Sequence, residues 1–228
     1  MNTLVIGDIH GCWDELQALL DQVGLNSDDA IISIGDMVDR GPESPRVLNF
    51  FRDMPNTRAI MGNHERKHLR SWRGETDAAP SQIIARFQFG DSYPMALDYI
   101  ETLPKYLELP EADLVHGFFE PGVPLDEQRD GVIVGTMSGE TYLERQFARP
   151  WYELYDGDKP LIVGHRDYLR AKKPLLYPNA APRVYGLDTG CVYGGALTGV
   201  ILPEFRLVSV LSRRNYWEEL QAQYADDL

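Results

Sequence analysis

Three short apolar runs in the first third of the chain each end in a glycine that is followed by a side chain able to bind a metal ion. They lead into the motifs GDIHG at 7–11, GDMVDRG at 35–41 and GNHE at 62–65. A helical pattern follows each run, and such alternation of strand and helix is typical of a parallel sheet. Because parallel strands end at one edge of a sheet, we expect the three motifs to meet there.

Two further apolar runs, at 114–115 and 161–163, lead into His116 and His165, so four of the five histidines stand at predicted strand ends. Residues 81–103 and 216–224 have a helical pattern. No linker or repeat divides the 228 residues, which we interpret as a single domain, 1–228. Additional strands are expected at 132–134, 184–185, 197–202 and 207–211, the last two as a hairpin around Pro203 and Glu204.

The charge balance limits the partners of the chain. It has 22 Lys and Arg residues against 35 Asp and Glu residues, a formal net charge of −13 at pH 7. A surface that coats nucleic acid or an anionic membrane is therefore excluded, whereas a small phosphate pocket made positive by metal ions is compatible. No stretch approaches the roughly 20 apolar residues that cross a bilayer, and the first residues do not resemble a secretory signal. We expect a soluble, cytoplasmic protein in which Cys12 and Cys191 are free thiols.

The candidate donors at the strand ends are carboxylate, amide and imidazole groups, without thiolate. This mixture suits manganese, iron or zinc ions better than a structural zinc site rich in sulfur. A single Asp or His at a strand end is ordinarily a turn, cap or core residue. Six such groups gathered at one edge would leave costly buried charge without a cation, so together they indicate a metal site.

In this order, the five motifs resemble the calcineurin-like metallophosphoesterase superfamily, specifically its phosphoprotein phosphatase branch, from Leu4 to about Val210. The resemblance implies an α/β fold, a layered sandwich of two mixed β-sheets flanked by helices. It also implies two divalent metal ions, and we expect manganese rather than iron or zinc. In the family pattern, Asp8 and His10 hold one metal, Asp36 bridges, and three residues hold the second metal: Asn63, His116 and His165.

The same resemblance implies how phosphate would be cleaved. Metal-bound hydroxide would attack the phosphorus of a phosphate monoester, without a phosphoenzyme. His64 would be the general acid, oriented by Asp39, and Arg40 would bind phosphate oxygens. A second arginine clamp is expected before the GH motif, and we favour Arg149 over Arg145.

Two later segments are expected at the rim of the site. The segment GLDTGCVYGGALT at 186–198 resembles one found in bacterial members and in symmetrical dinucleoside tetraphosphatases, with Tyr193 as a candidate substrate contact. The segment GHRD at 164–167 departs from the GHT pattern of bacterial members. The charges of Arg166 and Asp167 are expected to alter the rim near the second metal.

Three functions remain open at this point. The complete VDRG and GNHE motifs favour a phosphatase of the protein serine/threonine type. The alternative is a hydrolase of dinucleoside polyphosphates such as diadenosine tetraphosphate, or of another nucleotide or small phosphorylated molecule. A catalytically silent, metal-binding regulatory protein is the third. We interpret Glu65 as structural, and the basic run at 66–73 as a solvated helix face rather than a phosphate-steering patch.

Overall fold

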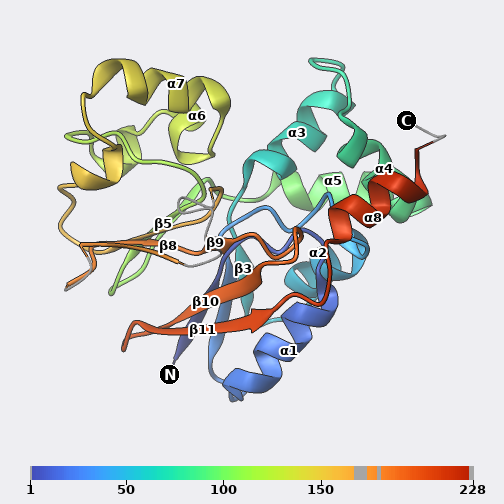
Figure 1. The fold of residues 1–228 in the computed structure, drawn as a ribbon, viewed down its shortest axis with the longest axis horizontal. Helices are drawn as coiled ribbons and strands as arrows, with labels where there is room; N and C mark the ends of the chain where they lie inside the picture. Colours follow the sequence, from blue (N-terminus) through green and yellow to red (C-terminus); the bar gives the residue numbers. More distant parts are fainter. Residues whose placement is uncertain (1, 167–173, 179–180, 226–228) are drawn as a thin grey trace.

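The structure is a computed structural model that describes residues 2–166, 174–178 and 181–225. Two mixed β-sheets form its centre, as the resemblance predicts (Figure 1). In the first sheet, the order is β11-β10-β1-β2-β3, and β9 pairs with β10. Strands β1 to β3 are parallel, whereas β10 runs antiparallel to both β1 and β11. The strands of this sheet are β1 (Thr3–Ile6), β2 (Ala30–Ser33), β3 (Thr57–Ala59), β9 (Asp188–Thr189), β10 (Ala196–Leu202) and β11 (Arg206–Leu211).

The second sheet has the order β4-β5-β6-β8-β7. Its three central strands, β5, β6 and β8, are parallel, and the outer two are antiparallel to their neighbours. Its strands are β4 (Tyr106–Glu108), β5 (Asp113–Val115), β6 (Leu161–Val163), β7 (Leu175–Tyr177) and β8 (Val184–Gly186). The predicted hairpin around Pro203 and Glu204 is confirmed by the antiparallel pair β10 and β11.

Helices flank both sheets. In Figure 1, α1 to α5 and α8 lie on the side of the first sheet, and α6 and α7 lie over the second. The helices are α1 (Trp13–Val23), α2 (Ser44–Asp53), α3 (Asn63–Trp72), α4 (Pro80–Phe89), α5 (Tyr93–Glu101), α6 (Asp130–Ile133), α7 (Met137–Gln146) and α8 (Tyr216–Gln223). Within the described ranges, none of these helices is both long and apolar enough to cross a bilayer.

The prediction of a strand at 132–134 is wrong. These residues belong to α6 and its end, where the backbone N–H groups of Val132, Ile133 and Val134 bond back to the carbonyls of Arg129 and Asp130. Three consecutive apolar residues fit a buried strand and a buried helical turn equally well, so the sequence pattern could not separate them.

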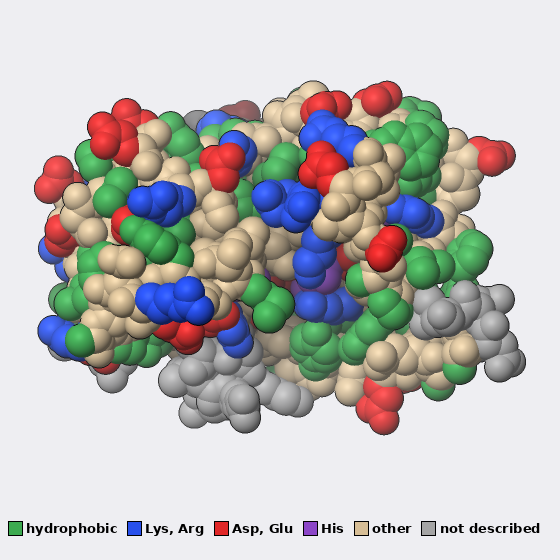
Figure 2. Space-filling model, turned by 90° about the horizontal axis from the view of Figure 1, so that it is seen from above, with side chains coloured by type: hydrophobic (Ala, Val, Ile, Leu, Met, Phe, Trp, Pro, Cys, Tyr) green, Lys and Arg blue, Asp and Glu red, His purple; other side chains and the backbone are tan. Residues whose placement is uncertain are grey.

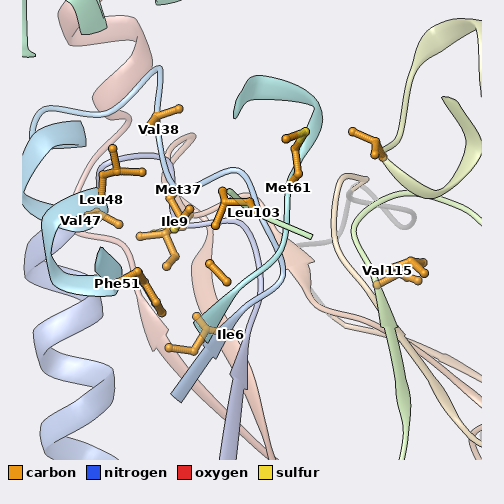
Figure 3. Close-up of a cluster of buried hydrophobic side chains, with 14 of the residues drawn as sticks. Ile6, Ile9, Met37, Val38, Val47, Leu48, Phe51, Met61, Leu103 and Val115 are labelled. Atoms are coloured by element: carbon orange, nitrogen blue, oxygen red, sulfur yellow. The ribbon is translucent and has the colours of Figure 1, made fainter. Parts of the chain in front are cut away.

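The core lies on both faces of the first sheet, which explains why its strands β1, β2 and β10 are mostly apolar and buried along their length. Val5 and Ile32 point toward the second sheet and pack in one cluster with Leu114 and Ile162. The side chains that face the helices pack in the other cluster. Figure 3 shows Ile6 and Ile9 there, with residues of the second metal-binding motif and of α2 around them. The loops that follow β1 and β2 therefore rest on a packed apolar base.

Candidate active site

The strand ends bring the predicted ligands together around Asp36, which is buried after β2. One oxygen, Oδ1, lies 3.4 Å from Nε2 of His116, and the other, Oδ2, lies 3.6 Å from Nε2 of His10. The carboxylate thus stands between two imidazoles from different sheets. Its two oxygens therefore face donors from both sheets.

Backbone contacts orient both of these imidazoles. Nδ1 of His10 lies 2.8 Å from the Val38 carbonyl, and Nδ1 of His116 lies 2.8 Å from the Ile34 carbonyl. A carbonyl only accepts, so each Nδ1 carries the proton. Nε2 of His10 accepts from the guanidinium of Arg40 at 2.9 Å, whereas Nε2 of His116 faces Asp36. Burial alone would lower the pKa of His116, but Asp36 raises it to about 10. The arrangement thus draws positive charge into the site.

The amide of Asn63 lies between the imidazoles of His116 and His165. Its oxygen lies 3.1 Å from Nε2 of His116 and 2.8 Å from Nδ1 of His165. With the amide reversed, its nitrogen would donate to those ring nitrogens and to Asp36. The reversed amide is satisfied by its protein neighbours alone. The set of carboxylate, amide and imidazole donors, rather than the amide orientation, is therefore what fits the divalent ions that the family implies.

Two groups of donors share Asp36. The first is His10, Asp36 and His64, and the second is Asp36, His116 and His165, with the donor atoms of each group within 4.8 Å of one another. Neither group includes Asp8, whose Oδ1 instead accepts a hydrogen bond of 2.9 Å from the backbone N–H of His165. A Cβ at position 164 would overlap this carboxylate, which explains the glycine there.

Backbone strain is concentrated at the site. Six non-glycine residues within the described ranges have a positive φ. One is Phe205, and the other five are His10, Asp36, Asp39, Arg40 and His165, with φ between 48° and 71°. This conformation is costly for residues with a side chain and persists where the surroundings enforce it.

Glu65 supplies part of that enforcement. Its buried Oε1 accepts the N–H groups of Met37 and Val38 at 2.8 and 3.3 Å, and its Oε2 accepts those of Asp36 and Gly62 at 2.8 and 2.9 Å. One carboxylate therefore ties the loop after β2 to the start of α3. These contacts support the structural interpretation of Glu65.

We expect Glu65→Gln to destabilise the metal-free protein by about 2–4 kcal/mol, because an amide nitrogen would face backbone donors in a buried place. At this chain length, each kcal/mol lowers Tm by about 2–4 °C. Glu101→Gln, at an exposed ion pair with Arg73, is the matched control and should change stability by less than about 0.5 kcal/mol. Equal melting curves for both variants in the presence of chelator would refute this role.

His64 and Asp39 form the expected pair, with Nδ1 of His64 2.6 Å from Oδ2 of Asp39. Nε2 of His64 is buried without a hydrogen-bond partner among the described residues and lies 4.0 Å from Oδ2 of Asp36. Burial tends to raise the pKa of Asp39, but His68 and His64 hold it below its usual value. The geometry keeps Nδ1–H of His64 on Asp39 and leaves Nε2 toward the metal-binding groups.

Sequence reasoning missed the second partner of Asp39. Nε2 of His68 lies 2.7 Å from Oδ1 of Asp39, and Nδ1 of His68 lies 2.8 Å from the hydroxyl of Tyr93 on α5. Both oxygens of the carboxylate are thus held by imidazole. The spacing of four residues between His64 and His68 puts them on one face of α3 and could have indicated this.

Of the predicted phosphate contacts, the structure brings Arg40 and Tyr193 to the site. Nη1 of Arg40 lies 2.9 Å from Nε2 of His10, and its guanidinium lies over the Tyr193 ring, 5.6 Å from the centroid. Arg149 pairs with Glu153 at 3.0 Å and lines a separate cavity of about 390 Å³ beside Trp151. Arg145 lines another cavity, which is formed by residues of α7.

A larger cleft, of about 530 Å³, opens directly beyond the second group of ligands. We call it the basic cleft; its lining includes Asn63, His165 and the cations Arg40, Arg66, Lys67, Arg70 and Arg166. One carboxylate, that of Glu140, also lines it and pairs with Arg166. Figure 2 shows Lys and Arg side chains gathered around a hollow in which histidine is visible. Arg66, Lys67 and Arg70 of the basic run at 66–73 line this cleft and remain partly or fully exposed, so the interpretation of the run as a solvated helix face stays a prediction. His68 is buried, Arg73 pairs with Glu101, and Asp167 lies outside the described residues.

The fold and the site together define a metallophosphoesterase, an enzyme that hydrolyses phosphoric esters. The model of the calcineurin-like phosphoesterase family matches residues 1–186. The chain belongs to the calcineurin-like phosphoesterase family.

Curated relatives align over nearly the whole chain. The asymmetrical bis(5'-nucleosyl)-tetraphosphatase PrpE of Bacillus subtilis (strain 168) is 30% identical over 243 residues, which cover 94% of this chain and 96% of the relative. The protein of that name from Halalkalibacterium halodurans is 30% identical, with 92% and 94% covered.

Solved structures share the fold. A crystal structure of a protein provisionally described as a diadenosine tetraphosphatase superimposes with a TM-score of 0.75 at 24% identity, covering 92% of this chain and 93% of that one. A serine/threonine phosphatase from Saccharomyces cerevisiae gives 0.61 at 16% identity, with 93% and 79% covered.

Proposed function

We propose that this enzyme hydrolyses dinucleoside polyphosphates, with diadenosine tetraphosphate as the representative substrate. The observation that carries the proposal is the end-to-end similarity to relatives named bis(5'-nucleosyl)-tetraphosphatases. The basic cleft beyond Asn63 and His165 supports it, because it offers more cations than a single phosphate group needs. This favours the alternative considered from sequence over the protein phosphatase.

The proposed cofactors are two divalent ions, manganese first, held by the residues around Asp36 and by Asp8. When bound, such ions polarise the phosphoryl group and make water a nucleophile near neutral pH. Arg40 would bind oxygens of the phosphate under attack through its guanidinium, which lies over the Tyr193 ring. His64 would hold a proton at Nε2 for the departing oxygen, with its ring fixed by Asp39.

One observation favours a second candidate, a phosphomonoesterase. The pair of His64 and Asp39 is complete, with the further support of His68. An alcohol leaving group needs a proton donor more than a nucleotide does, because a nucleotide departs as a phosphate that is already acidic. The leaving group thus separates the two candidates chemically.

A substrate panel tests the proposal. At fixed Mn²⁺, we expect kcat/KM for diadenosine tetraphosphate to exceed that for p-nitrophenyl phosphate and for phosphoserine peptides by about 100-fold or more, or about 3 kcal/mol. Chromatography of the products should show asymmetrical cleavage, which yields one nucleoside triphosphate and one mononucleotide. A preference for the phosphopeptides would reject the proposal and support the second candidate.

A further inference from the structure

The basic residues of α3 form a row that starts at a metal ligand. Asn63, Arg66, Lys67 and Arg70 are spaced by three and four residues, so they share one face of the helix. The opposite face is buried through His64, Glu65, His68 and Leu69. At 1.5 Å per residue, the row extends about 10 Å from Asn63.

Local pairing with carboxylates accounts for only one of the three cations in this row. Arg70 pairs with Glu75 and Arg166 with Glu140, whereas no carboxylate among the described residues pairs with Arg66 or Lys67. Arg66 and Arg70 are like charges four residues apart, an arrangement that destabilises a helix. The net charge of the chain is −13, so this concentration of cations runs against its overall composition. A bound anion would offset the repulsion.

The row also adjoins the reaction site. With the Asn63 amide reversed, Nζ of Lys67 donates to its oxygen at 3.3 Å. Arg166 follows the ligand His165 and reaches the same cleft from the other sheet. An anion in this cleft would be continuous with a phosphate held at the metal-binding groups.

We propose that Arg66, Lys67, Arg70 and Arg166 form a distal anion site that binds the phosphates next to the one under attack. Its ligand is a linear phosphate chain, supplied by a dinucleoside polyphosphate or by inorganic polyphosphate. As a statement about the natural substrate, the proposal of a distal anion site rests on the proposed function. The volume of about 530 Å³ suits a ligand longer than one phosphate, and the acidic surface disfavours a nucleic acid in its place.

Inhibition measurements on the manganese-loaded enzyme test the site, with p-nitrophenyl phosphate hydrolysis as the reporter and free Mn²⁺ held constant. The readout is the ratio of the inhibition constants of orthophosphate and tripolyphosphate, which isolates the effect of the added phosphates. In the unmodified enzyme we expect tripolyphosphate to bind at least about tenfold more tightly. The double substitution R66Q/K67Q should remove most of that ratio. Arg73→Gln, on the same helix but paired with Glu101, should keep it.

Two results would overturn the distal site: a ratio near one in the unmodified enzyme, or an unchanged ratio in R66Q/K67Q. ATP as a third inhibitor distinguishes the sources of the chain, since tighter binding of ATP than of tripolyphosphate assigns the site to nucleotides. The unmodified enzyme could fail to hydrolyse diadenosine tetraphosphate and still show the expected ratio of inhibition constants. If R66Q/K67Q then lost that ratio, the result would reject the proposed function but support the distal site.

Discussion

Asp36→Asn is expected to abolish hydrolysis of p-nitrophenyl phosphate and diadenosine tetraphosphate and to lower the bound manganese in parallel. Asp36 is the one residue that both donor groups share, and its two oxygens face His116 and His10 separately. Loss of a residue that merely supports a ligand costs about 10- to 100-fold in metal affinity or activity. Loss of a shared ligand should exceed that, so we expect at least about a 10³-fold fall in kcat/KM.

Metal analysis and activity should be measured on the same samples, before and after treatment with a chelator. Asp53→Asn removes an exposed carboxylate that pairs with Arg52, and this control should keep both metal and turnover. A second prediction of the same geometry is proton release on metal loading, because Asp36 draws a proton onto His116 in the metal-free site. If Asp36→Asn retained its manganese, or if the chelated enzyme stayed active, the shared site would be refuted.

The sequence predicted the centre of this site because strand ends determine it. Apolar runs that end in glycine and a donor gave the positions of Asp8, Asp36 and Asn63, and parallel pairing of β1 to β3 then brings them to one edge. His116 and His165 follow from the same rule in the second sheet, where β5 and β6 are parallel. The family resemblance supplied the packing of one sheet on the other, for which no local pattern exists.

The rest depends on contacts between residues that are distant in the chain. The burial of His68 is decided by Asp39 and Tyr93, which are 29 and 25 residues away, so a basic sequence alone could not show it. The cations of α3 line a cleft only together with the segment at 135–140 and Arg166, which are distant from them in the chain. Arg149 precedes a single 3-10 turn at Trp151–Glu153, too short to give a periodic signal for its pairing with Glu153.

His64→Asn should lower kcat by about 10²–10⁴-fold for a substrate with a poor leaving group while both metal ions stay bound. The structure gives His64 a protonated Nδ1 on Asp39 and a buried Nε2 without a partner among the described residues. The same Nε2 lies within the donor group of His10 and Asp36, so a metal measurement must accompany the kinetics. Loss of bound manganese would show that His64 is a ligand rather than the acid.

The leaving group provides the sharper test, because it separates proton donation from disruption of the site. Phenol has a pKa of about 10 and needs a proton as it departs, whereas p-nitrophenol is more acidic and needs it less. His64→Asn should therefore slow phenyl phosphate hydrolysis far more than p-nitrophenyl phosphate hydrolysis. A nucleotide leaving group should resemble p-nitrophenol. An equal loss on all three substrates would mean that His64 only shapes the site, and the general acid would have to be sought elsewhere.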